Sequence, residues 1–175
     1  MDLVLSSLLV LAAQGGGQSA AQPPPPASCD TTEHRQFDFW VGRWKVYRSD
    51  TNQLVAHSLI EKLYGGCAVR ENWMPIGGTG GGSINSWRPS ERKWHQTWTD
   101  SGNNWNEYVG GMDGGLMVLT GTSAKAGGSA VSVRMTYEAK RDGSVVQTGY
   151  QSQDGGKNWA LTYQFLYRPD DASSK

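Results

Sequence analysis

The chain has 175 residues, enough for one domain, and its 16 basic residues balance its 16 acidic ones. This balance argues against the strong positive field that binds nucleic acid or an anionic membrane. Apolar residues make up only 37%, whereas 23 Gly and 8 Trp are unusually many. Such a composition favours a sheet with many tight turns and a core of a few large aromatic side chains.

Residues 1–22 are typical of a signal peptide. Leu3 to Ala13 form an apolar, uncharged run that is too short to span a bilayer, and small residues follow it. Asp2 stands where a signal peptide usually carries a basic residue. We expect export to the periplasm or the extracellular space, without membrane insertion of the mature chain. An uncleaved apolar tail is the alternative.

The remaining boundaries follow from composition. Pro-rich residues 23–28 read as a linker that cannot join a sheet. We expect the folded domain at 29–169 and a disordered tail at 170–175.

Cys29 and Cys67 are the chain's two cysteines. In an oxidising compartment they most simply pair with each other, which would stabilise the fold by about 3–4 kcal/mol through the loop of about 40 residues that it closes. Two free buried thiols are the alternative. A lipid anchor on Cys29 is disfavoured, because no apolar residue stands three positions before it.

The one good helical candidate is Asp30 to Trp40, with Asp30 as a cap and Gly42 as a stop. After it the pattern changes to alternation between turn-forming residues, which predicts ten strands. Their expected positions are about 43–49, 53–63, 67–74, 81–88, 92–100, 104–111, 115–121, 130–140, 144–152 and 159–168.

Short links make consecutive strands antiparallel neighbours, and a sheet this wide removes its exposed edges by closing. We therefore predict an all-β fold, a single up-and-down antiparallel barrel of about ten strands with a short N-terminal helix. The aromatic stretch Phe37–Trp40 should plug one end of this barrel.

The strand at 92–100 indicates where a site could lie. Trp94, Gln96, Trp98 and Asp100 share one face of this strand, and an inward Trp face would place Gln96 inside the barrel. Similar alternation in neighbouring strands suggests a lumen lined by Trp with a few convergent polar groups. The candidate ligand-binding residues are Glu71, Trp73, Asn85, Trp87, Gln96, Trp98, Arg134 and Gln147.

A buried Glu71 would need a partner, for which Arg134 is the obvious candidate. The alternative is a filled barrel whose polar residues point outward. Its interior residues would then be Ile84, Val133, Met135 and Val145.

Other chemistries lack support in the sequence. His34, His57 and His95 have no metal-ligand spacing, and neither a nucleophile motif nor a phosphate loop is present. We therefore expect no metal and no cofactor. The Gly-rich run Gly77–Gly82 reads as a hairpin loop that could also form an entrance to the barrel.

The segment Ser152–Trp159 matches the pattern SxDxGxxW and resembles the Asp-box hairpin of sialidases and other β-proteins. This resemblance implies a structural turn, in which Asp154 caps backbone amides and Trp159 packs beneath it. A single copy favours a hairpin and not a propeller.

Several motifs together resemble a bacterial family of secreted proteins of unknown function, over about residues 35–168. They are FDFWVGRW at 37–44, GGC at 65–67, Glu71 with Trp73, GGSIN at 81–85, WHQTWTD at 94–100, RMTY at 134–137 and SQDGGKNW at 152–159. The resemblance implies a calycin barrel, similar to lipocalins, fatty-acid-binding proteins and nitrobindins. It further implies that Arg168 packs across Trp44 where the first and last strands meet. Haem, the nitrobindin ligand, is not expected, because His95 lies on the strand face opposite Trp94 and Trp98.

These observations favour an exported, non-enzymatic binding protein for a small, partly apolar molecule. The first alternative is a barrel enzyme with Glu71 or Asp100 as general base and Arg134 stabilising negative charge. A raised pKa of Glu71 would favour the enzyme, and pairing with Arg134 would weaken it. The second alternative is a structural or interaction module with a filled barrel.

Overall fold

The computed structural model describes residues 29–123 and 130–170. The expected signal peptide at 1–22, the linker at 23–28 and most of the expected tail lie outside these residues. Asp170 still belongs to the barrel, since its backbone N–H donates to the Arg43 carbonyl over 2.9 Å and its carboxylate lies 3.0 Å from Lys45 Nζ. No helix among the described residues is long and apolar enough to cross a membrane.

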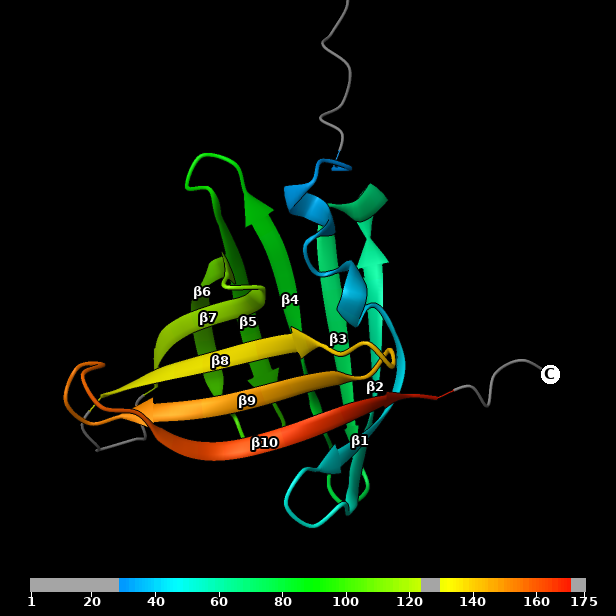
Figure 1. Ribbon diagram of the computed structural model, residues 1–175, viewed down its shortest axis with the longest axis vertical. Helices are drawn as coiled ribbons and strands as arrows, with labels where there is room; N and C mark the ends of the chain where they lie inside the picture. The colour runs from blue at the N-terminus through cyan, green and yellow to red at the C-terminus, as the bar shows by residue number, and fades with distance from the viewer. Residues whose placement is uncertain (1–28, 124–129, 171–175) are drawn as a thin grey trace, which may run out of the picture.

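Ten antiparallel strands form a closed barrel, which confirms the predicted fold (Figure 1). Each strand pairs with its neighbours along the chain, and the pairing of the first with the last closes the cylinder. The strands are β1 (Gly42–Arg48), β2 (Leu54–Leu63), β3 (Ala68–Pro75), β4 (Gly81–Arg88), β5 (Lys93–Asp100), β6 (Trp105–Asp113), β7 (Leu116–Ser123), β8 (Val131–Ala139), β9 (Val145–Ser152) and β10 (Ala160–Pro169).

Two short 3-10 helices, η1 (Glu33–Arg35) and η2 (Asp38–Trp40), replace the single helix expected at 30–40. Phe37 separates them with φ −98° and ψ 5°, outside the helical region. In Figure 1 this blue segment lies between the ends of β2 and β3 and the ends of β4 and β5. It therefore covers one end of the barrel.

Aromatic side chains fill this end, as the sequence predicted. Phe37 and Trp40 are fully buried. The Phe37 ring meets Trp94 and Tyr137 edge-on at centroid distances of 5.0 and 5.5 Å. Trp44 Nε1 donates to the Trp40 carbonyl over 2.8 Å and so links the plug to β1. Truncating one such buried ring typically costs about 3–5 kcal/mol, so the plug is a main part of the core.

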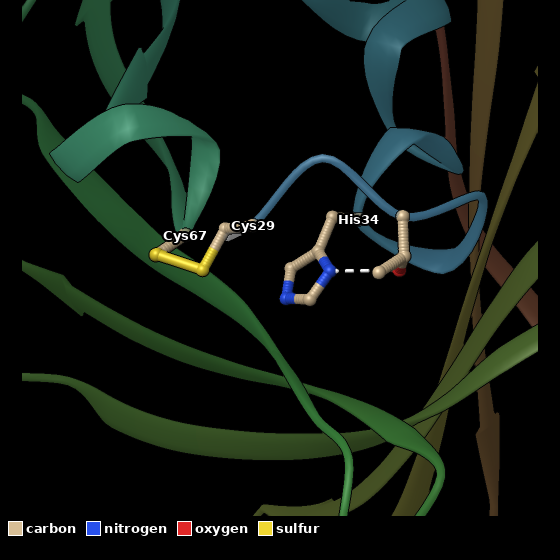
Figure 2. Close-up of a disulfide and its surroundings, with 4 residues drawn as sticks. Cys29, His34 and Cys67 are labelled. Atoms are coloured by element: carbon tan, nitrogen blue, oxygen red, sulfur yellow. Dashed lines mark hydrogen bonds between the residues drawn. A yellow bond between two sulfur atoms is a disulfide. The ribbon is translucent and has the colours of Figure 1, made fainter. Parts of the chain in front are cut away.

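Cys29 and Cys67 form a disulfide, which confirms the predicted pairing (Figure 2). Their Cα atoms lie 4.8 Å apart, and the bond joins the segment before η1 to the start of β3, next to η3 (Tyr64–Gly66). Gly66 has φ 93°, and a Cβ there would meet the Cys29 carbonyl oxygen at 2.8 Å. Glycine is therefore needed at the position that lets the two segments approach each other.

The predicted contact of Arg168 with Trp44 is wrong. Trp44 is 5% exposed and points inward, and its partner in the β1–β10 register is Pro169. Arg168 is one residue away and so lies on the outer face. There its guanidinium lies 4.5 Å from the centre of the Tyr47 ring and donates to Asn52 Oδ1 over 2.9 Å. An arginine–aromatic contact is therefore present where β1 pairs with β10, but its aromatic partner is Tyr47 and not Trp44.

The hairpin between β9 and β10 has the geometry of an Asp-box. Asp154 Oδ1 accepts hydrogen bonds from the backbone N–H groups of Lys157 and Asn158 at 3.0 and 2.9 Å. Hydrogen bonds, first that of the Ser152 hydroxyl, hold the pKa of Asp154 well below its usual range. A Cβ on Gly156 would lie 3.3 Å from Trp159, so the indole packs directly beneath the turn. The motif is structural here, as its resemblance implied.

Candidate functional site

A cavity of about 290 Å³ lies inside the barrel. It lies away from the plugged end, because Phe37, Trp40 and Trp94 do not line it. Seven of its twelve lining residues are aromatic, and they alternate with a few polar groups. The lining residues are Glu71, Trp73, Gln96, Trp98, Asn106, Tyr108, Met135, Tyr137, Gln147, Tyr163, Phe165 and Tyr167.

A second hollow adjoins the cavity at the loop between β3 and β4. It is lined by residues 77–80 of that loop and by Asp100, and it shares Trp73 and Trp98 with the cavity. This is the Gly-rich segment in which the sequence suggested an entrance. Its position beside two lining tryptophans fits that interpretation.

Five of the eight candidate ligand-binding residues line the cavity, namely Glu71, Trp73, Gln96, Trp98 and Gln147. The inward Trp face of the strand at 92–100 thus has the predicted orientation.

Two further candidates lie inside the barrel but beneath the cavity. Asn85 is fully buried, and its Oδ1 accepts from Gln96 Nε2 over 2.7 Å. Trp87 packs against Trp94, with ring centroids 6.5 Å apart, toward the plugged end. Both residues support the site and do not line it.

Arg134 does not belong to the site, and its expected pairing with Glu71 is wrong. It pairs with Tyr150 across β8 and β9, on the face of β8 opposite Met135 and Tyr137. Its guanidinium lies 4.7 Å from the Tyr150 ring centre and 4.5 Å from that of Trp159. The prediction chose the wrong face of β8, where the apolar set Val133, Met135 and Tyr137 decides the orientation instead.

Glu71 is the buried carboxyl of the cavity, with 4% of its surface exposed. Its partners are neutral hydroxyls: Ser58 Oγ donates to Oε1 over 3.1 Å, Ser83 Oγ donates to Oε2 over 3.4 Å, and Tyr167 Oη lies 3.4 Å from Oε1. Burial raises the pKa of Glu71 to about 7, although the three hydroxyls act in the opposite direction. Glu71 therefore changes its charge close to neutral pH.

Hydrogen bonds between side chains fix the floor of the cavity around Glu71. Gln96 Nε2 and Gln147 Nε2 donate to the Tyr137 hydroxyl over 3.2 and 3.0 Å. Tyr167 Oη donates to Gln147 Oε1 over 2.8 Å, and its contact with Glu71 Oε1 connects this network to the carboxyl. Burial raises the pKa of both tyrosines well above the usual value, so they stay neutral. The floor is thus polar, internally satisfied and pre-organised.

Asp100 lies at the rim, where Trp98 Nε1 donates to Oδ2 over 3.0 Å and Asn104 Nδ2 donates to both carboxylate oxygens. Partial burial acts to raise its pKa, but these hydrogen bonds and two backbone ones outweigh it and lower the pKa. Asp100 therefore stays ionised at neutral pH, in contrast to Glu71.

The sequence prediction missed most of the aromatic lining. In β10 the aromatic residues Tyr163, Phe165 and Tyr167 occupy alternate positions, a pattern that predicts one aromatic strand face. Tyr137 was readable in the same way, from its spacing with Met135. Tyr108 and Asn106 lie in a strand whose glycines obscure the alternation.

The three histidines lie elsewhere. His34 is buried near the disulfide, with Nδ1 2.9 Å from Thr31 Oγ1 (Figure 2). His95 Nε2 lies 2.7 Å from Glu91, and His57 Nδ1 lies 3.5 Å from Asp170. Within residues 29–123 and 130–170, no group of three or more His, Cys, Asp or Glu side chains could hold a metal ion.

The fold and the cavity define a class, a closed ten-stranded barrel with an internal aromatic pocket around one buried carboxyl. No known family model matches the chain, and no curated protein is significantly similar to it.

Proposed function

We propose that this chain is an exported binding protein for a small, partly apolar molecule that occupies the cavity around Glu71. The main support for this proposal is the cavity, which has a volume of about 290 Å³, seven aromatic lining residues and a few convergent polar groups. Small-molecule sites typically combine apolar walls with a small number of placed polar groups. A filled structural module would need this space to be occupied by side chains.

Two observations support the exported location. The disulfide between Cys29 and Cys67 suits an oxidising compartment, and the apolar run Leu3–Ala13 suits a signal peptide. The closed antiparallel barrel also agrees with the proposed kinship to lipocalin-like secreted proteins, for which the sequence motifs are the main argument.

A barrel enzyme is the second candidate, and one observation favours it. A carboxyl whose pKa is about 7 is well suited to act as a general base, and Glu71 has this property. Asp100 is less suited, because its pKa is lowered. Arg134 lies on the outer face of β8, so this candidate lacks its expected charge stabiliser. We therefore place binding first.

The test uses the neutral fluorescent probe N-phenyl-1-naphthylamine, whose emission rises in apolar pockets. We expect saturable binding to the mature protein and at least about tenfold weaker binding to Trp98→Ala, because one aromatic contact surface is lost. Trp105→Ala is the matched control, since Trp105 is 66% exposed and does not line the cavity. Equal affinities of the two variants would show that the probe binds elsewhere and that the pocket assignment is wrong.

Mass spectrometry under non-denaturing conditions complements this titration. A small molecule that co-purifies with the wild-type protein from its native compartment, and is lost from Trp98→Ala, would identify the ligand directly.

A further inference from the structure

The cavity walls present ring faces and edges from several strands. On one side, Trp73 of β3 packs against Phe165 of β10 at 5.5 Å, and Phe165 stacks on Tyr163 at 4.9 Å. Trp98 of β5 and Tyr108 of β6 add further rings to the lining. Aromatic faces carry partial negative charge and attract cations, most strongly when the cation is desolvated.

The carboxyl of Glu71 lies in this aromatic cavity, and none of the described residues places a countercharge beside it. Its hydrogen-bond partners Ser58, Ser83 and Tyr167 are neutral, and the described lining contains no Lys, Arg or His. An ionised carboxylate buried in this way is costly unless an opposite charge compensates it. Asp100 at the rim adds negative potential, because its partners among the described residues are the neutral Trp98 and Asn104 side chains and backbone N–H groups.

We propose that the ligand is an organic cation, an alkylammonium group on a small apolar body, whose charge lies among the rings and beside the Glu71 carboxyl. This inference rests on the proposed function, since it names the ligand class of the same cavity. A neutral ligand would leave an ionised Glu71 without a countercharge, and an anion would be repelled by ionised Glu71 and by Asp100.

Binding of such a cation is coupled to the charge of Glu71. In the folded protein without ligand, the pKa of Glu71 is about 7. A bound cation favours the ionised form of the carboxyl, so at lower pH its binding displaces a proton from Glu71. The affinity for a permanent cation therefore rises about tenfold between pH 6 and pH 8 and levels off above.

Among the described lining residues, Glu71 is the one whose charge changes between pH 6 and pH 8. Tyr108, Tyr137, Tyr163 and Tyr167 have raised pKa values, chiefly through burial, and stay neutral over this range. Asp100 stays ionised, and Arg134 lies on the outer face of β8.

The experiment compares choline with 3,3-dimethylbutan-1-ol, its neutral counterpart of nearly equal shape, by isothermal titration calorimetry on the mature disulfide-bonded protein. We expect choline to bind at least about tenfold more tightly at pH 8, as cation–aromatic and carboxylate contacts imply. Glu71→Gln keeps the shape and removes the charge, so it should abolish both the preference and its pH dependence. Glu107→Gln is the control, since it removes one charge from an exposed position of β6.

Two results would overturn the inference: equal affinity for choline and the alcohol, or choline affinity that does not change between pH 6 and pH 8. The pH profile of the wild-type protein decides the matter even if Glu71→Gln fails to fold. If N-phenyl-1-naphthylamine binds but choline binds no more tightly than the alcohol, the ligand is not a cation, whereas the proposed binding function still holds. If neither this probe nor choline nor the alcohol binds, the binding function itself is wrong.

Discussion

Replacing Glu71 by Gln should make the folded barrel less sensitive to pH. Folding raises the pKa of Glu71 from 4.5 to about 7, because the carboxyl leaves water for the aromatic cavity. The folded protein therefore holds a proton that the unfolded chain releases between these two pH values, and stability falls as pH rises through this window. The loss is complete above the folded pKa and amounts to about 3 kcal/mol.

Glu71→Gln removes this loss and keeps the shape of the side chain. We expect the variant and the wild type to be nearly equal in stability near pH 4.5, and the variant to be more stable by about 2–3 kcal/mol at pH 8.5. Urea unfolding of both proteins under non-reducing conditions, at several pH values, gives the difference directly, and the titration of the histidines cancels in it. Glu107→Gln should show no such trend, because its carboxyl is exposed.

An equal stability difference between Glu71→Gln and the wild type at pH 5 and pH 8.5 would contradict this prediction. Such a result would mean that Glu71 is solvated or paired in the folded protein. The proposal of a cationic ligand would then lose its main support, which is a buried carboxyl that has no opposite charge among the described residues.

Two further predictions concern the framework of the site. The double variant Cys29→Ala/Cys67→Ala should lose about 4 kcal/mol of stability, since the disulfide spans a sequence separation of 38; an unchanged urea midpoint would contradict this. Gly149→Ala should cost about 1–3 kcal/mol and weaken N-phenyl-1-naphthylamine binding, because its Cβ would collide with the ring of the lining residue Tyr163. Gly111→Ala is the control, since a Cβ there has no neighbour within 4 Å, and equal effects of the two substitutions would contradict the packing argument.

The amino-acid sequence predicts the strands of this barrel more accurately than it predicts which face of a strand points inward and which side chains meet. The alternation of residues in β8 predicts Arg134 inside the barrel as a partner of Glu71, whereas the apolar residues Met135 and Tyr137 beside it occupy the interior. Alternation defines two faces of a strand, but it does not say which one points inward when both carry mixed residues. Where β1 meets β10, the resemblance implies a contact of Arg168 with Trp44, but Arg168 lies opposite Lys45 on the outer face and packs on Tyr47 instead.

The ten strands, the plug of Phe37–Trp40 and the disulfide could be predicted from the amino-acid sequence, because turn chemistry, aromatic patterning and cysteine count are local or nearly local properties. The folded barrel is needed to see that the partners of Glu71 among the described residues are neutral hydroxyls, and that rings from β3, β5, β6, β8 and β10 surround it. Burial and the distance to the nearest opposite charge depend on every strand that closes around a side chain, so they cannot be read from one strand. The pKa of Glu71, and with it the chemistry of the cavity, is therefore a property of the closed barrel.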